Sequence, residues 1–132
     1  IGIIGCGQIA KIRHVPELAE SKDAELAGFY DYVPEHARSL ANRYGGKVYD
    51  QYEEMLDDET IDGVVICTSN DSHGRISMEA LKRDKYVLCE KPMCMSLKEA
   101  GQVLELSRRV RHFTWQPITS VLPWPIERQR RF

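Results

Sequence analysis

The chain has 132 residues, of which 42% are hydrophobic and 29% charged, and its formal net charge is −2. This length and composition predict one globular domain and exclude a disordered, collagen-like or coiled-coil protein. The small net charge and the lack of any apolar run of roughly 18 residues lead us to expect neither a nucleic-acid nor a membrane partner.

Short apolar runs alternate with helical patterns along most of the chain. The runs expected to form strands are Ile1–Ile4, Ala24–Tyr30, Lys47–Tyr49, Ile61–Cys67 and Tyr86–Cys89. The stretches expected to form helices are one that follows Ala10 and runs through Glu20, then Pro34–Tyr44, a brief one around Glu54–Leu56, Ser72–Arg83, and a last one with apolar positions from Leu97 to Leu106. Strands that alternate with helices favour an α/β fold, a doubly wound parallel sheet with helices on both faces.

Several residues indicate where these helices begin, bend or end. Pro16 predicts a kink or two short helices in the first helical stretch, since proline removes a backbone donor. Pro34 suits a first helical turn, and the glycine pair 45–46 ends that helix. The patterns Asp50-x-x-Glu53 and Ser96-x-x-Glu99 have the spacing of capping boxes, so each predicts a helix start.

The four cysteines indicate free thiols. Cys6, Cys67, Cys89 and Cys94 contain no C-x-x-C pair and lie mostly in apolar runs. A reducing, cytoplasmic location is therefore expected, ahead of a disulfide framework or a zinc site.

The candidate functional residues lie where the predicted strands end. They are Gly5–Ala10, Asp31, Thr68–Asn70 and Glu90–Pro92. In a parallel α/β sheet, ligands bind beyond the carboxyl ends of the strands, at the point where the strand order reverses. These four segments are therefore predicted to meet around one ligand.

The first of these segments has the pattern Gly5-x-Gly7-x-x-Ala10 between a strand and a helix. The first glycine permits a tight turn, and the second lets a diphosphate approach the backbone at a helix N-terminus. The small Ala10 allows the helix to pack closely on the strand. The pattern favours a dinucleotide site; the alternative is a turn that is tight for structural reasons only.

Asp31 follows the second strand, where a carboxylate accepts hydrogen bonds from the adenosine ribose of a bound dinucleotide. A negative charge there repels a 2′-phosphate, so NAD is predicted in preference to NADP. A solvated acid at the end of a strand is the simpler alternative.

Glu90-Lys91-Pro92 directly follows the fifth apolar strand. A lysine placed there can hold a substrate hydroxyl, or act in proton transfer where burial lowers its pKa. The alternative is a solvated charged pair.

Three motifs together resemble the N-terminal NAD(P)-binding Rossmann domain of the Gfo/Idh/MocA oxidoreductases, which include glucose–fructose oxidoreductase and inositol dehydrogenase. The motifs are Gly5-Cys6-Gly7-Gln8-Ile9-Ala10, Thr68-Ser69-Asn70-Asp71-Ser72-His73 and Cys89-Glu90-Lys91-Pro92-Met93. They occur in the family's order and spacing over residues 1–109. The resemblance implies an NAD(P)-dependent dehydrogenase that acts on a sugar or polyol and whose full-length relatives form homo-oligomers.

The resemblance also implies roles for individual residues. The cofactor-binding residues would be Gly5, Gly7, Gln8, Ile9, Asp31, Thr68, Ser69, Asn70, His73, Glu90 and Lys91. Within this set Gln8 and Ile9 would contact the diphosphate, and Lys91 would be the catalytic residue that touches both cofactor and substrate. For His73, a purely structural role is the open alternative.

The composition changes near the end of the chain. Residues 1–106 carry a net charge of −7, whereas residues 107–132 carry six arginines and one glutamate. We expect residues 1–109 to form the cofactor domain with a truncated first strand, residues 110–132 to be an atypical tail in place of the family's sixth strand, and the family's C-terminal substrate domain to be absent. A misread end of the reading frame is favoured over a native, interrupted strand, and three arginines at the end fall short of a nucleic-acid-binding face.

Two other functions are compatible with a glycine-rich turn after the first strand. A non-catalytic nucleotide sensor or interaction module is the main alternative, and without a second domain we expect weak NAD binding and little turnover. A methyltransferase is disfavoured, because Ile4 stands where an acidic residue is expected and Glu90-Lys91-Pro92 would have no use. The acidic run 57–59 is interpreted as a solvated turn, not a metal site.

Overall fold

The computed structural model describes residues 1–110 and 113–115, and its centre is a six-stranded sheet with the strand order β3-β2-β1-β4-β5-β6. Every pairing in this sheet is parallel. The strands are β1 (Gly2–Ile4), β2 (Gly28–Tyr30), β3 (Lys47–Val48), β4 (Gly63–Ile66), β5 (Tyr86–Cys89) and β6 (Phe113–Trp115). The order reverses at β1, whose neighbours are β2 and β4, so a ligand is expected beyond the carboxyl ends of these three strands.

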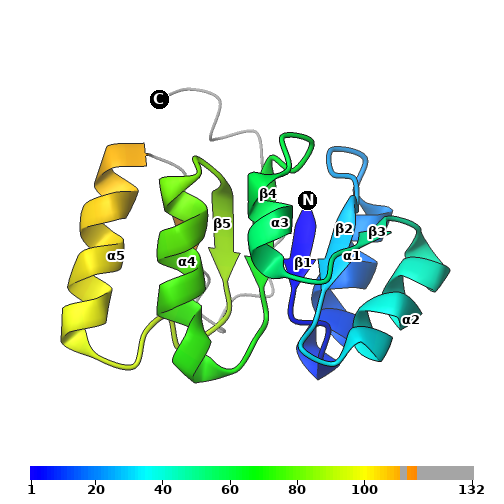
Figure 1. The fold of residues 1–132 in the computed structure, drawn as a ribbon, viewed down its shortest axis with the longest axis horizontal. Coiled ribbons are helices and arrows are strands. Elements are labelled where there is room, and N and C mark those ends of the chain that lie inside the picture. The colour runs from blue at the N-terminus through cyan, green and yellow to red at the C-terminus, as the bar shows by residue number, and fades with distance from the viewer. Residues whose placement is uncertain (111–112, 116–132) are drawn as a thin grey trace.

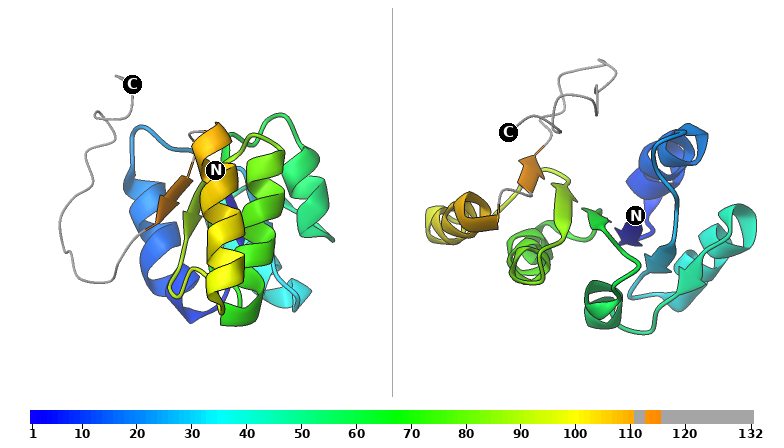
Figure 2. Two further views of the ribbon diagram at one scale, coloured as in Figure 1. Left: turned by 90° about the vertical axis from the view of Figure 1, so that its left-hand side faces the viewer. Right: turned by 90° about the horizontal axis from the view of Figure 1, so that it is seen from above.

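Helices cover both faces of the sheet (Figures 1 and 2). One face carries η1 (Ala10–His14), α1 (Val15–Glu20) and α2 (Pro34–Tyr44). The other face carries α3 (Tyr52–Asp57), α4 (His73–Lys82) and α5 (Leu97–Val110), with the short turn η2 (Asn70–Ser72) leading into α4. The predicted doubly wound α/β fold is therefore confirmed.

Two apolar cores lie on the two faces because successive side chains of a strand point in opposite directions. Ile4 and Ile66 pack with Leu81 of α4 in one cluster. Ile3 packs with Phe29 and other residues of the opposite cluster, which includes side chains from η1, α1 and α2. A strand buried on both faces is continuously apolar, which explains the runs that marked β1 and β4 in the sequence.

The first helical stretch is two short helices, as Pro16 predicted. Residues 10–14 form a π-helical turn in which the Val15 N–H donates to the Ala10 carbonyl oxygen, and α1 begins at Val15 with Pro16 in its first turn. The wide turn ends just before Pro16, which has no backbone N–H to donate.

The sheet extends further than the sequence indicated. The composition favours an atypical tail after Arg109, with an interrupted strand as the alternative; in the structure, β6 pairs in parallel with β5 through residues 113–115. The predicted strands β2 and β4 are also shorter than expected, at Gly28–Tyr30 and Gly63–Ile66. The interpretation of residues 116–132 as an arginine-rich remnant lies outside the described residues.

Within the described part of the chain, none of the helices combines the length and apolar character that crossing a membrane requires.

Candidate functional site

The loop after β1 is held tightly against the end of β4. The Gly5 N–H donates to the Tyr30 carbonyl oxygen at 2.8 Å, and the Cys67 N–H donates to the Ile4 carbonyl oxygen at 2.8 Å. Gly5 has a φ of 92°, and a Cβ there would lie 2.6 Å from the carbonyl carbon of Cys67. Only glycine fits this position, because both the backbone conformation and the neighbouring chain exclude a side chain.

Gly7, two residues later, has a different environment. A Cβ at Gly7 would meet no atom within 4 Å, and this residue lines a pocket. The backbone becomes helical at Gln8 and stays so through residue 20. Space beside a glycine at the start of a helix is what an anion such as a diphosphate requires.

Asp31 connects the glycine loop with the end of β2. Its Oδ2 accepts from the Cys6 N–H at 2.6 Å, and its Oδ1 accepts from the Val33 N–H at 2.8 Å. Nδ1 of His36 lies 3.3 Å from the same Oδ1. The carboxylate is 12% exposed, so it is fixed in place while one edge still reaches solvent.

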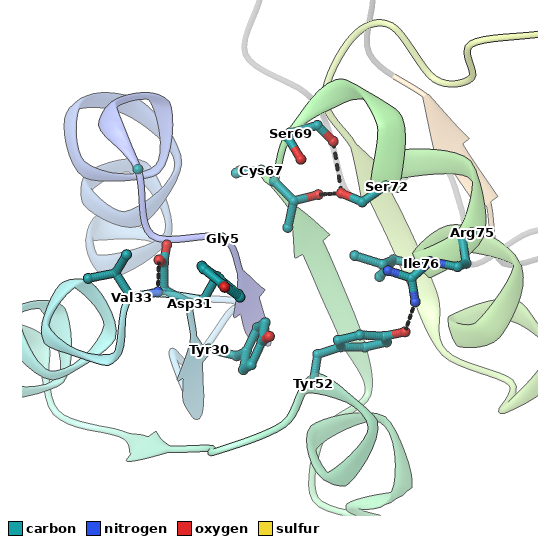
Figure 3. Close-up of a pocket in the computed structure, with 13 residues that line it drawn as sticks. Gly5, Tyr30, Asp31, Val33, Tyr52, Cys67, Ser69, Ser72, Arg75 and Ile76 are labelled. Atoms are coloured by element: carbon teal, nitrogen blue, oxygen red, sulfur yellow. Dashed lines mark hydrogen bonds between the residues drawn. The ribbon is translucent and has the colours of Figure 1, made fainter.

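The ends of β1, β2 and β4 enclose a pocket of about 490 Å³ (Figure 3). Five residues of the predicted site line it: Gly5, Gly7, Asp31, Thr68 and Ser69. Sequence reasoning missed the other lining residues, which are Tyr30, Tyr32, Val33, Tyr52, Cys67, Ser72, Arg75 and Ile76. The structure thus brings three of the four predicted strand-end segments to one cavity.

Four of the missed residues form the wall of the pocket across from Asp31: Tyr52, Ser72, Arg75 and Ile76 (Figure 3). Tyr30 and Val33 lie beside Asp31. Nη1 of Arg75 donates to the Tyr52 hydroxyl at 2.6 Å, and the Tyr52 ring meets the Tyr30 ring edge-on with centroids 5.7 Å apart. Burial and the hydrogen bond to Glu79 raise the pKa of Tyr52, so it stays protonated. A signal existed for one part of the wall, since positions 72, 75 and 76 share a helical face.

The loop after β4 is organised by its own hydrogen bonds. The Ser72 hydroxyl donates to the Thr68 hydroxyl oxygen at 2.6 Å, and Asn70 is exposed outside the pocket lining. His73 is 1% exposed, with Nδ1 2.8 Å from the Pro92 carbonyl oxygen and Nε2 3.0 Å from that of Thr68. His73 therefore does not line the pocket; its ring links two backbone segments.

Glu90 and Lys91 follow β5 and lie outside the pocket lining. Nε2 of His14 donates to Oε1 of Glu90 at 2.7 Å, and the Lys91 N–H donates to Oε2 at 3.1 Å. Burial alone would raise the pKa of Glu90, but these hydrogen bonds outweigh it and hold the pKa below its usual value. The Lys91 side chain is exposed.

The lowered pKa of Glu90 predicts a pH dependence of stability. A carboxyl whose folded-state pKa is depressed stabilises fully above its unfolded value near 4.5 and loses this contribution as the pH falls through the folded value. We expect acidification from pH 5 to 3 to reduce the free energy of unfolding less in Glu90→Gln than in the wild type. Urea unfolding at both pH values measures this; equal losses would show that Glu90 does not contribute.

The acidic turn 57–59 forms hydrogen bonds with neighbouring side chains of the same chain. Asp58 accepts from the Tyr49 hydroxyl at 2.7 Å and from the Thr60 hydroxyl at 2.6 Å. These bonds lower the pKa of Asp58, with the Thr60 hydrogen bond as the largest cause.

Comparison with known proteins identifies this arrangement. The model of an oxidoreductase family with an NAD-binding Rossmann fold, Gfo/Idh/MocA, matches residues 1–115 and so includes β6. Glucose-6-phosphate 3-dehydrogenase of Bacillus subtilis (strain 168) is 38% identical over 110 residues, which cover 83% of this chain and 31% of that protein. Myo-inositol 2-dehydrogenase of Thermotoga maritima is 30% identical over 83% of this chain and 33% of its own length.

Solved structures agree. An NAD-binding protein from Listeria innocua has a TM-score of 0.79 at 34% identity over 87% of this chain and 34% of that one. A 3-ketoreductase from Actinomadura kijaniata, solved with NADP and TDP-benzene, has a TM-score of 0.78 at 27% identity over 83% and 34%. The chain spans about a third of the length of the relatives it matches. By the match over residues 1–115, the chain belongs to the Gfo/Idh/MocA oxidoreductase family and carries its NAD-binding Rossmann fold.

Proposed function

We propose that the chain is the cofactor-binding part of an NAD-dependent dehydrogenase that acts on a sugar or polyol. The observation that carries the proposal is the pocket that joins Gly7, Asp31 and Ser69 at the carboxyl ends of β1, β2 and β4. The names of the relatives, glucose-6-phosphate and inositol dehydrogenases, support the substrate class.

The residues of the pocket fit a dinucleotide. The open space beside Gly7 would take the diphosphate, next to the backbone of Gln8 and Ile9 at the helix start. Asp31 would accept from the adenosine ribose, as its partly exposed carboxylate allows. Thr68, Ser69 and Asn70 would border the cofactor along the loop after β4.

The nicotinamide would lie toward Glu90 and Lys91. When bound, it supplies the acceptor for a hydride from a carbinol carbon of the substrate. Lys91 would hold the substrate hydroxyl by charge and hydrogen bond, which an exposed ammonium on a firmly held backbone can do. His73 is proposed to support the site through the backbone and not by touching the cofactor.

We propose NAD over NADP, on the charge of Asp31. Its Oδ2 and Oδ1 both hold backbone N–H groups, so the carboxylate cannot easily turn away from a 2′-phosphate. Two nearby cations already have partners: Arg38 is paired with Glu35 at 2.8 Å, and Arg75, which lines the pocket, donates to the Tyr52 hydroxyl at 2.6 Å. The relative solved with NADP makes this preference the point to measure first.

The binding prediction can be tested on the purified 132-residue chain. We expect NADH to bind weakly, with saturation in the micromolar to millimolar range, and more tightly than NADPH. Nicotinamide fluorescence during titration measures both. An absence of saturation by either nucleotide would overturn the proposal.

A panel of sugars and polyols with NAD then separates an enzyme from a sensor. Because the chain spans about a third of its relatives' length, we expect binding with little turnover. Rapid NADH formation would contradict that expectation. Homo-oligomer formation by full-length relatives and a cytoplasmic location stay predictions. Buried thiols support the latter, and burial raises the pKa of Cys6 to about 12.

A further inference from the structure

Two buried histidines meet the residues on either side of Lys91. His14 lies in η1 and is 5% exposed, and His73 begins α4 and is 1% exposed. Neither lines the pocket. They come from opposite faces of the sheet and reach the same turn after β5.

His14 fixes Glu90 through its side chain. The carboxylate can only accept, so Nε2 of His14 carries the proton in the 2.7 Å hydrogen bond to Oε1. The other oxygen, Oε2, accepts the Lys91 N–H at 3.1 Å. The Glu90 N–H donates to the Ile66 carbonyl oxygen at 3.0 Å, which ties the same residue to the end of β4. A chain of hydrogen bonds therefore connects η1, which follows the glycine loop, to the backbone of Lys91.

His73 fixes the other side of the turn through the main chain. One ring nitrogen lies 2.8 Å from the Pro92 carbonyl oxygen and the other 3.0 Å from that of Thr68. A neutral ring can donate to one of these acceptors, and a doubly protonated ring to both. The imidazole spans the gap between the loop after β4 and the turn after β5.

From these contacts we propose that His14 and His73 are positioning residues that brace the backbone on both sides of Lys91, so that its exposed ammonium is presented in one place. The inference rests on the proposed function and extends it to two residues that touch neither cofactor nor substrate.

Stability alone gives a weak reason for the His14–Glu90 pair. Both side chains are largely buried, at 6% and 14% exposed. Replacing both partners of a buried polar pair with apolar groups of similar shape can be nearly neutral or stabilising. A fixed orientation of the following residue is what the pair supplies and apolar packing would not.

The effect of the two histidines on the backbone at Lys91 can be measured in the protein without nucleotide. Amide hydrogen exchange followed by NMR should be at least tenfold faster at Lys91 in His14→Ala and in His73→Ala than in the wild type, with the amides of α2 unchanged. Arg38→Gln, an exposed position on α2, is the control and should change neither. Unchanged exchange at Lys91 in both histidine variants would overturn the proposal.

A second measurement separates positioning from general loosening. His14→Ala should weaken NADH binding about tenfold while the affinity for ADP, which lacks the nicotinamide half, stays within twofold. His14→Gln keeps a donor toward Glu90 and should restore most of the loss. An equal loss of affinity for NADH and for ADP would overturn the proposal. Should the wild type bind neither nucleotide, the proposed function is refuted, and the exchange experiment still decides whether the brace exists.

Discussion

Replacing Gly5 with alanine is expected to lower the free energy of unfolding by about 3 kcal/mol, the size typical of a strained backbone combined with a steric overlap. The φ of 92° disfavours any L side chain, and the new methyl group would lie 2.6 Å from the carbonyl carbon and oxygen of Cys67. Relief would require β1 and β4 to separate where they are hydrogen-bonded. We therefore expect the variant to lose NADH binding as well. Urea unfolding and nicotinamide fluorescence measure the two effects.

Gly7→Ala is the matched control, because it adds the same methyl group two residues away. Nothing lies within 4 Å of that position, so stability should change by no more than about 0.5 kcal/mol. NADH binding should nevertheless weaken at least tenfold, since the methyl group would occupy the space assigned to the diphosphate. Intact binding in Gly7→Ala would contradict the placement of the diphosphate, and intact stability in Gly5→Ala would contradict the packing of the loop.

The sequence was informative wherever the signal is local. The glycine loop, the alternation of strands with helices and the division at Pro16 all depend on neighbouring residues, and the structure confirms them. Ser96 is confirmed as a cap, because its hydroxyl accepts the Glu99 N–H at 3.2 Å. Asp50 has the same spacing but does not cap: α3 begins at Tyr52 after Gln51, with no side-chain cap. Spacing alone does not determine the residue at which the helix begins.

Features that depend on distant parts of the chain escaped prediction. Strand β6 has three residues, and its place at the edge of the sheet comes from pairing with β5. Tyr52 and Arg75 meet on one wall of the pocket because α3 and α4 lie on the same face of the sheet. His14 and Glu90 are 76 residues apart in the sequence, so no local pattern links them.

Asp31 combines two roles that a single substitution can separate. Its carboxylate holds the Cys6 and Val33 N–H groups, and hydrogen bonds to a charged group contribute about 1.5–3 kcal/mol each. The same charge is proposed to accept from the ribose of NAD and to repel the 2′-phosphate of NADP. Loss of the hydrogen bonds to the backbone would weaken the binding of both nucleotides equally. Loss of the carboxylate's contact with the ribose would weaken the binding of NADH selectively.

Asp31→Ala is therefore expected to raise the Kd for NADH at least tenfold and to leave the Kd for NADPH changed by less, so that the preference between them falls or reverses. Titration of both nucleotides by fluorescence gives the ratio. Asp58→Ala is the control, since that carboxylate also holds a turn together but lies outside the pocket lining. It should lower stability and leave the ratio unchanged. An equal loss of affinity for NADH and NADPH in Asp31→Ala would mean that the carboxylate only stabilises the glycine loop. Selectivity would then depend on other residues of the pocket.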